Sequence, residues 1–393
     1  MRRSFANVGL FCDCFPPVMD GVAVCMENYA RWMQEKVGRV KVITPNVPEA
    51  DYGALPYEVL NYLSVPIPMR KPYVAGFSDI DPLLFKKLAE TRFRIVHAHC
   101  PFTSGRAAQR VAKRQGIPCV GTFHSKYRED FSRLFIKPVV DVIIKNIIAF
   151  YENCDLVWVP QESVIDVIRE YGYTGPVEVM DNGSDLVADY PEQFFVEARR
   201  KLGIKPETFV MLFVGQHIWE KNPKLIIEGL AEMGDVPFRM FFIGTGYAEE
   251  EMKALVSEKG LDDKVTFVGL LKDRQYLTQY YAAADLFLFP SLYDNAPLVV
   301  REAAALHTPA VMAEGATASS IIRDGENGFL VRDDPQEFAA KVRSLVADPA
   351  RVHRVGVQAA HSIVRSWEDC VEEALDRYNV LLKSWRLPEI ERL

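Results

Sequence analysis

The stretch LFLFPSLYDNAPLVVREAAAL, residues 286–306, leads from an apolar run through a polar turn into an amphipathic segment. The apolar run lacks period-two alternation, which is typical of a strand buried on both faces. Pro297 suits the first turn of a helix, where its missing N–H would have no partner in any case. Asp294 lies in the turn and Glu302 on the helix, so two carboxylates stand eight positions apart. This order predicts a strand–turn–helix unit of a parallel α/β domain.

The same alternation of apolar runs and amphipathic segments continues along the chain. The runs expected to form buried strands are NVGLF, VKVIT, IVHAH, PCVGTF, CDLVWVP, PVEVMDNG, FVMLFVG, RMFFIGTG, VTFVGL and PAVMA. The segments expected to form helices are ENYARWMQEK, DPLLFKKLAE, GRAAQRVAKRQG and the one from Pro223 to Met233. We therefore predict an α/β fold with two doubly wound domains facing each other across a cleft, and ligands outside the carboxyl ends of the strands.

The length of 393 residues suits two domains of similar size. The first domain is expected over residues 1–186 and the second over residues 187–365, with the polar segment VADYPEQFF as the linker. Within residues 366–393, SWEDCVEEALDRYNVLLKSW predicts one long amphipathic helix.

Composition narrows the class of protein. Seven cysteines without a CxxC pair favour a reducing compartment over a disulfide framework or a structural zinc site. The N-terminal sequence lacks the apolar core of a signal peptide, and no run approaches the roughly 18 apolar residues of a membrane span. Residues 1–150 hold 21 Lys and Arg against 13 Asp and Glu, a balance of +8, whereas residues 151–393 hold 25 against 40, a balance of −15. A basic half suits an anionic partner, but ordinary variation between domains explains it equally well.

Candidate site residues in the first half follow predicted strands. The loop FPPVMDGV is not GxGxxG, which counts against a dinucleotide-binding domain. Gly21 could allow a phosphate close to helix N-terminal amides, although an ordinary turn glycine is the plainer interpretation of this motif alone. His124 directly follows a predicted strand, a position that favours a site role, although a loop histidine with satisfied hydrogen bonds is the plainer alternative. His97 and His99 share one strand face; the sequence offers no third metal ligand nearby, so packing is favoured. The DxD motif at residues 79–81 precedes a proline, which favours an N-cap aspartate over a metal site.

Candidate residues in the second half surround two predicted helix starts. Lys221 ends the loop of VGQHIWEKNPKLIIEGL, where a cation could meet a phosphate, although a surface lysine is the plainer interpretation. GTG at residues 244–246 is expected to let a turn pack closely. Amides from Leu298 onward could bind a diphosphate, and Glu302, roughly 7 Å along the helix axis from Pro297, could accept hydrogen bonds from a ribose. Asp294 could then meet a sugar, although a capped helix with a later glutamate shows the same spacing.

In this order the motifs resemble the retaining glycosyltransferases of family 4, which have the GT-B fold. The motifs that carry the resemblance are FPPVMDGV, VHAHCPF, GIPCVGTFHSKY, VMDNGSDL, VGQHIWEKNPKLIIEGL, FVGLLKD, YAAADLFLFPSLYDNAPLVVREAAAL, DGENGFLV and the terminal helix. The resemblance covers nearly the whole chain. It implies an enzyme that transfers a hexose from a nucleoside-diphosphate sugar, UDP-sugar first, to a lipid or glycan acceptor, without metal or cofactor, with the terminal helix crossing back to the first domain.

The resemblance also implies roles for individual residues. Asp294 and Glu302 correspond to the family's two glutamates eight residues apart, the first at the donor sugar and the second at the ribose. His124 would lie beside the reacting centre, while Lys221 and Gln216 would meet the diphosphate. The remaining implied donor contacts are Gly21 for the phosphates, Leu271 for the base, and Asn295, Ala296, Pro297, Leu298 and Val299 for the sugar and diphosphate.

Three positions depart from the family pattern. Asp294 replaces the usual glutamate and is one methylene shorter, Gln216 replaces the usual arginine, and Asp20 replaces the first of two glycines. Two alternatives therefore stay open: an epimerase-like enzyme that turns over a nucleotide sugar without an acceptor, and a nonenzymatic sugar-nucleotide-binding protein.

The expected acceptor segment is HSKYREDFSRLFIKPVVDVIIKNIIAFY, residues 124–151. It resembles the segment after the histidine loop in family members that glycosylate diacylglycerol-type lipids. Its basic residues, interspersed with apolar ones, are Lys126, Arg128, Arg133, Lys137 and Lys145. A membrane-surface helix and a core helix with a basic outer face both fit, and the core helix is slightly favoured. We expect a cytoplasmic protein, peripheral at an anionic inner membrane face, that binds no nucleic acid.

Overall fold

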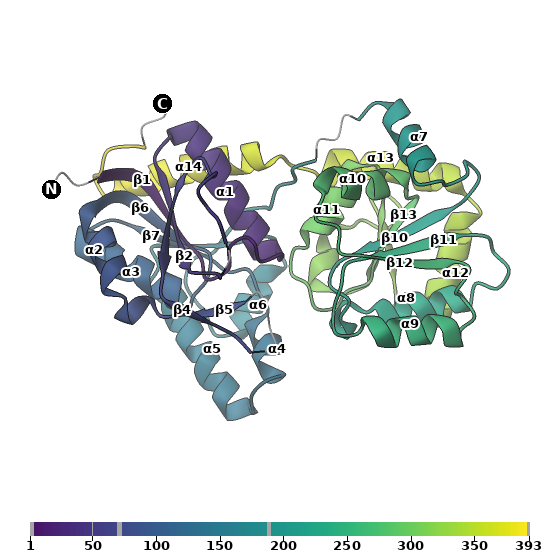
Figure 1. Cartoon of the computed structure of the whole chain (residues 1–393), viewed down its shortest axis with the longest axis horizontal. Coiled ribbons are helices and arrows are strands. Elements are labelled where there is room, and N and C mark those ends of the chain that lie inside the picture. The colour runs from purple at the N-terminus through teal and green to yellow at the C-terminus, as the bar shows by residue number, and fades with distance from the viewer. Residues whose placement is uncertain (1–3, 49, 69–72, 187–189, 391–393) are drawn as a thin grey trace. The chain divides into compact units, whose positions relative to one another are not determined.

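A computed structural model describes residues 4–48, 50–68, 73–186 and 190–390. The chain divides into two compact units (Figure 1). The first comprises Met1–Gly183 together with Trp367–Leu393, and the second comprises Ser184–Ser366. The domain boundaries predicted from the sequence, after residues 186 and 365, are close to these positions.

The first unit is built on a parallel sheet with the strand order β3-β2-β1-β6-β7-β8-β9. Its strands are β1 (Ser4–Phe11), β2 (Val40–Pro45), β3 (Glu58–Tyr62), β6 (Thr91–Ala98), β7 (Cys119–Thr122), β8 (Leu156–Val159) and β9 (Glu178–Val179), and β4 (Ser64–Pro66) pairs antiparallel with β5 (Val74–Gly76). Its helices are α1 (Gly21–Val37), α2 (Pro82–Glu90), α3 (Thr103–Gln115), α4 (Tyr127–Ser132), α5 (Lys137–Glu152), α6 (Val164–Glu170) and α14 (Trp367–Ser384), with a 3₁₀ turn at Ser78–Ile80. Each apolar run expected as a strand in this half overlaps one of these strands.

The second unit repeats the pattern with the strand order β12-β11-β10-β13-β14-β15. Its strands are β10 (Val210–Val214), β11 (Arg239–Ile243), β12 (Val265–Gly269), β13 (Leu286–Phe289), β14 (Ala310–Ala313) and β15 (Phe329–Val331). Its helices are α7 (Glu192–Lys201), α8 (Pro223–Ala231), α9 (Glu249–Glu258), α10 (Arg274–Ala283), α11 (Leu298–Ala305), α12 (Pro335–Val346) and α13 (Pro349–Ile363), with 3₁₀ turns at Trp219–Lys221 and Thr317–Ile321. In Figure 1, α8, α9 and α12 cover one face of this sheet, and α10, α11 and α13 the other.

Each sheet has one place where the strand order reverses. In the second unit the chain runs from β10 outward through β11 and β12, then returns to β13 beside β10 and continues through β14 and β15. In the first unit β1 and β6 are the corresponding neighbours. Because all these strands are parallel, the loops that follow two neighbouring strands leave the same edge of the sheet. Open α/β sheets bind ligands at such a point, so it is where the candidate site is expected.

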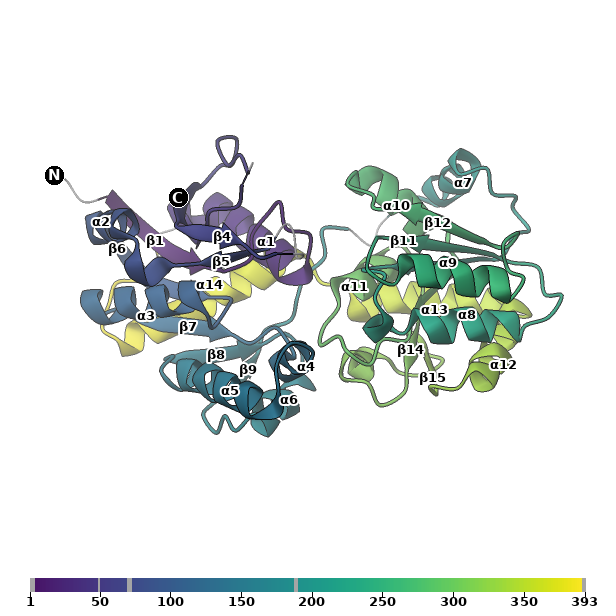
Figure 2. The same ribbon diagram turned by 60° about the horizontal axis from the view of Figure 1, so that its bottom comes forward.

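The terminal helix α14 belongs to the first unit and packs beside α1 (Figures 1 and 2). Trp367 and Tyr378 of α14 are buried. The ammonium of Lys36 on α1 forms ion pairs with Glu368 and with Glu372, the latter at 2.7 Å. The helix therefore closes the hydrophobic core of the first unit although 183 residues of the second unit separate it in sequence.

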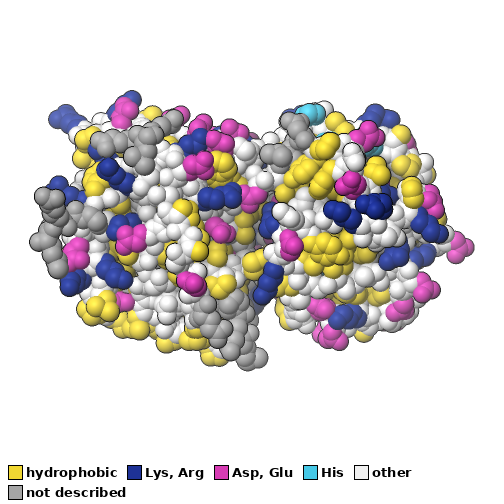
Figure 3. All heavy atoms as spheres, turned by 45° about the horizontal axis from the view of Figure 1, so that its top comes forward, with side chains coloured by type: hydrophobic (Ala, Val, Ile, Leu, Met, Phe, Trp, Pro, Cys, Tyr) yellow, Lys and Arg dark blue, Asp and Glu magenta, His cyan; other side chains and the backbone are white. Residues whose placement is uncertain are grey.

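Some local expectations differ from the structure. Helix α11 begins at Leu298, so Pro297 occupies the N-cap position and not the first turn. The expected linker VADYPEQFF is helical from Glu192 onward, and residues 187–189 within it lie outside the described residues. Strands β3, β4, β5 and β15 were not expected. On the face drawn in Figure 3, basic and acidic side chains are interspersed on both units. Among the described residues, no helix combines the length and apolar character that crossing a bilayer requires.

Candidate active site

Lys221 and Asp294 form an ion pair where the strand order of the second unit reverses. Lys221 lies in the loop after β10, and Asp294 in the loop after β13. The Lys221 ammonium lies 2.7 and 2.8 Å from the two carboxylate oxygens of Asp294. The side chains are only 12% and 17% exposed, so the pair is shielded from water. The Ser291 hydroxyl donates to Asp294 Oδ2 at 2.7 Å, and the ring of Phe289 lies 5.1 Å from the ammonium. The cation and the carboxylate are thus held in one defined geometry.

Two glycines shape the loop that carries Lys221. A Cβ on Gly244 would stand 1.9 Å from the carbonyl oxygen of Gly215, and one on Gly246 would stand 2.1 Å from that of His217. The GTG turn therefore packs directly on this loop, which confirms the expectation of close packing. Gln216, which lies in the same loop, is exposed.

Glu302 lies on α11 and is 6% exposed. Its carboxylate accepts a hydrogen bond from the Tyr281 hydroxyl at 2.9 Å and pairs with the Arg274 guanidinium at 2.8 Å. Burial, and then the charge of Glu302, raises the pKa of Tyr281 well above its usual value, so the hydroxyl stays a donor. Both partners come from α10, and sequence reasoning missed them because no local pattern links α10 to α11. Leu271, in the loop between β12 and α10, is half-buried against the core.

The segment from Asn295 to Val299 leads from the Asp294 loop into α11. Asn295 is buried, and Pro297 at the N-cap has extended backbone angles, φ −68° and ψ 126°. The first-turn amides of a helix have no intrahelical acceptor and carry partial positive charge, so Leu298 and Val299 supply anion-binding groups. Arg301 is buried on this helix, and its guanidinium donates to the Ile363 carbonyl oxygen at 2.8 Å. This side chain joins α11 to the end of α13.

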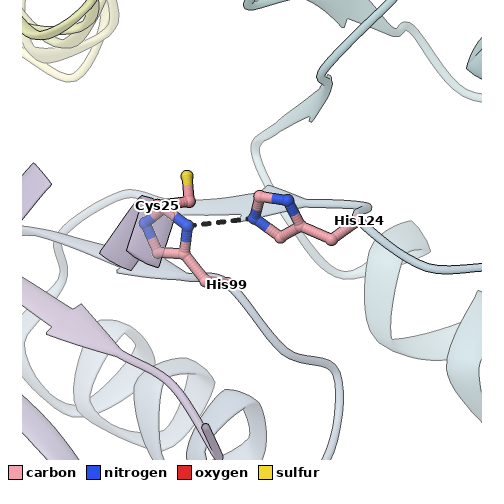
Figure 4. Close-up of side chains that lie close together, drawn as sticks. All are labelled: Cys25, His99 and His124. Atoms are coloured by element: carbon pink, nitrogen blue, oxygen red, sulfur yellow. Dashed lines mark hydrogen bonds between the residues drawn. The ribbon is translucent and has the colours of Figure 1, made fainter. Parts of the chain in front are cut away.

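His124 follows β7 in the first unit and lies against His99, which follows β6 (Figure 4). His124 Nε2 is 3.1 Å from His99 Nδ1, and the two rings stack with their centroids 5.4 Å apart. Burial lowers the pKa of His124 to about 4 and that of His99 well below its usual value, so both imidazoles are neutral at neutral pH. The Cys25 thiol on α1 joins them, with one potential ligand atom from each residue within 4.8 Å of the others.

His97 and His99 have different surroundings in the structure. His97 packs as predicted, with Nδ1 2.5 Å from the Tyr378 hydroxyl and Nε2 2.7 Å from that of Thr122. Next to His99 the fold brings two groups that are distant in sequence, Cys25 and His124. The interpretation of the DxD motif is confirmed, since Asp81 caps α2 by accepting from Leu83 and Leu84 amides.

The loop with Asp20 and Gly21 opens α1. Asp20 is the N-cap: one carboxylate oxygen accepts from the Ala23 amide at 2.8 Å, and the other accepts from the Cys14 thiol and the Tyr73 hydroxyl. Gly21 is exposed, and a Cβ there would meet nothing within 4 Å. The chain's own packing therefore leaves open space at Gly21.

Comparison with known proteins identifies the two units. The model described as Glycosyltransferase Family 4 matches residues 19–187, and the model described as Glycosyl transferases group 1 matches residues 195–362. Alpha-monoglucosyldiacylglycerol synthase of Acholeplasma laidlawii is 24% identical over 82% of this chain and 84% of its own length. A sulfoquinovosyl transferase of Arabidopsis thaliana is 26% identical over 98% of this chain and 76% of its own length.

Solved structures share the architecture. An Anabaena protein in complex with UDP and glucose has a TM-score of 0.75 at 18% identity, covering 95% of this chain and 99% of that chain. Sucrose-phosphate synthase of Thermosynechococcus elongatus has a TM-score of 0.79 at 20% identity, covering 97% of this chain and 100% of that chain. At such identities these likenesses show the fold, while the two family models together span most of both units. The chain therefore belongs to the family 4 glycosyltransferases and is a sugar-transferring enzyme with the GT-B fold.

Proposed function

We propose that the chain transfers a hexose from a nucleoside-diphosphate sugar to a lipid or glycan acceptor, with retention of anomeric configuration and without a metal ion. UDP-glucose is the first candidate donor. The observation that carries the proposal is the Lys221–Asp294 ion pair beside the N-terminus of α11, with Glu302 one turn further along that helix. The cation and the helix amides can bind a diphosphate. The two carboxylates can accept hydrogen bonds from hydroxyl groups on either side of it, those of the sugar and those of the ribose.

Donor binding would exchange partners at this ion pair. The diphosphate would take up the Lys221 ammonium and the amides of Leu298 and Val299, which would release Asp294 to accept hydrogen bonds from sugar hydroxyls. Glu302 is already oriented by Arg274 and Tyr281, so its remaining acceptor capacity can meet a ribose. The Anabaena relative of the same fold was solved with UDP and with glucose, which supports a donor of this class.

The reaction breaks the bond between the anomeric carbon and the diphosphate oxygen and forms a bond from that carbon to the acceptor hydroxyl oxygen. The negative charge that develops on the diphosphate would be stabilised by Lys221 and by the α11 N-terminus. Gln216 can donate a hydrogen bond there but brings no charge. In a front-face displacement the acceptor proton passes to the departing diphosphate, and neutral His124 would line the reacting centre. The name of the Acholeplasma relative specifies an alpha-linked glucose, as retention from an alpha-linked donor requires.

A lipid acceptor is supported by an exposed apolar surface on the first unit. The α4–α5 surface consists of Leu134, Phe135, Ile136, Val139 and Val142, each at least 41% exposed. Exposed Lys137 and Lys145 lie on the same helix, α5, whose opposite face is buried in the core. The expected core helix thus has an outer face that is apolar as well as basic. Such a face fits an anionic lipid surface.

The proposal is tested with a panel of UDP-, ADP- and GDP-sugars, each assayed in EDTA with and without diacylglycerol or glycan acceptors. We expect UDP-glucose to release UDP only when an acceptor is present, and the product to keep the alpha configuration by NMR. Turnover without acceptor would favour an epimerase-like enzyme, and binding without turnover a nonenzymatic protein. If no nucleotide sugar binds, the proposal is wrong.

The substitution Lys221→Met removes the cation from the leaving group. We expect kcat/KM to fall about 100-fold or more, as for other groups that stabilise transition-state charge. The matched control is Lys224→Met, because that lysine lies on neighbouring α8 and its side chain is 62% exposed. Steady-state kinetics measure the change, and thermal unfolding shows whether both variants fold. If the two variants have the same kcat/KM, Lys221 does not stabilise the leaving group.

The substitution Glu302→Ala removes the expected ribose acceptor. We expect the donor Kd to rise about 10- to 100-fold, since a hydrogen bond to a charged group contributes about 1.5–3 kcal/mol. Titration calorimetry with the nucleoside diphosphate measures it. Glu337→Ala, which changes an exposed side chain on α12 of the same unit, serves as control and should bind normally. An unchanged Kd for Glu302→Ala would contradict the assignment.

Substitution of Ile136 and Val142 together by aspartate should weaken membrane binding. Each side chain buries apolar area at a lipid surface, so we expect the partition coefficient on phosphatidylglycerol vesicles to fall at least about tenfold. Vesicle sedimentation measures it. Val380→Asp is the control, because that valine on α14 is 69% exposed and lies outside the α4–α5 surface. Equal sedimentation of both variants would rule out this surface as the membrane contact.

A further inference from the structure

We propose that Cys25, His99 and His124 form a site for a borderline-soft divalent cation such as Zn²⁺, and that the bound ion inhibits transfer by occupying His124. The inhibition rests on the proposed function, in which His124 lines the reacting centre. Cation binding itself does not depend on that function.

The three side chains converge from separate elements of the first unit. Cys25 lies within α1, His99 follows β6 and His124 follows β7. One potential ligand atom from each residue lies within 4.8 Å of the other two. Figure 4 shows the thiol and the two rings close together. A tetrahedral zinc ion with Zn–N bonds of about 2.0–2.1 Å separates two nitrogens by about 3.3–3.4 Å. The 3.1 Å between His99 Nδ1 and His124 Nε2 needs only a small adjustment to reach that separation.

The hydrogen bonding of His99 supports a ligand role. Its Nδ1 meets His124, whereas its Nε2 is buried and has no hydrogen-bond partner within the described residues. With Nδ1 as the ligand atom, the ring proton of His99 stays on Nε2, and Nδ1 exchanges its hydrogen bond to His124 for a bond to the cation. His97, two residues away, shows the contrast, because both its ring nitrogens have hydroxyl partners.

The chemistry of the three groups selects the ion. A thiolate and two imidazoles suit zinc, cobalt and copper, whereas magnesium and calcium prefer oxygen ligands. Three protein ligands leave a fourth tetrahedral position for water or another ligand. Cys25 and His99 are buried and His124 is half-exposed, so the site can be reached from the His124 side. On binding, the Cys25 thiol releases its proton to solvent and no electron changes hands.

The test uses untagged full-length protein, stripped with EDTA and titrated with Co²⁺. We expect one equivalent to bind, with a thiolate-to-cobalt charge-transfer band and the intense visible bands of a tetrahedral ion. Cys25→Ala should lose the charge-transfer band and bind at least about tenfold more weakly. Cys119→Ala is the matched control, because that cysteine is equally buried and lies outside the site. If no charge-transfer band forms, or if both variants retain it, the site is wrong.

A second arm addresses inhibition. With the donor and acceptor that support transfer, stoichiometric Zn²⁺ should lower the rate of the wild type and of Cys119→Ala at least about tenfold, and EDTA should restore it. Cys25→Ala should keep its basal rate and resist Zn²⁺. Cobalt binding without inhibition would overturn the inhibitory role alone. Absence of any transferase activity would count against the proposed function and leave the cobalt result to decide the cation site.

Discussion

The reversal of strand order between β10 and β13 is the constraint on which the candidate site depends. Two loops that leave adjacent parallel strands emerge at the same sheet edge, so their side chains meet although they are remote in sequence. Lys221 and Asp294 are 73 positions apart, yet their charged atoms lie 2.7 Å from each other. In the first unit the same reversal places β1 beside β6, and β7 lies on the other side of β6. The loop after β7, which carries His124, therefore contacts the loop after β6, which carries His99.

The Lys221–Asp294 pair also explains how a charged site can be stable before a donor arrives. Shielding an isolated ammonium from water is costly, and an opposite charge offsets much of that cost. Asp294 supplies the charge when the site is empty, and a diphosphate would supply it when the donor binds. An aspartate reaches the ammonium here with Ser291 supporting it, so the carboxylate is positioned by the loop and not by a longer side chain. The departure from glutamate therefore fits a site whose resting state is a closed ion pair.

The sequence predicted the elements whose signal is local. Buried parallel strands appear as unbroken apolar runs, so β10 and β13 could be placed, and Pro297 indicated that Glu302 lies on the helix that follows β13. Strand β3, with the sequence EVLNY, is only partly buried and was missed because it lacks such a run. Arg274 and Tyr281 could not be assigned to Glu302, since only the packing of α10 against α11 brings them together. The position of Cys25 beside the histidines could not be predicted for the same reason. Nothing in the sequence of α1 distinguishes Cys25 from an ordinary core residue.

The three histidines of the first unit show why sequence spacing alone does not separate structure from function. His97 at the end of β6 and His99 just after it are both buried, with ring centroids 4.1 Å apart, and burial lowers the pKa of both. Their difference lies in hydrogen-bond saturation: Tyr378 and Thr122 occupy both nitrogens of His97, which locks that ring into the core. In the part of the chain that the structure describes, His99 Nε2 is buried without a hydrogen-bond partner, and His99 Nδ1 lies against Nε2 of a neutral, half-exposed His124. Both ring nitrogens of His97 are held by hydroxyl groups of the core, whereas the hydrogen bond between His99 and His124 can be exchanged for bonds from both rings to a cation. The partners supplied by α14 and β7 therefore decide which histidine is structural.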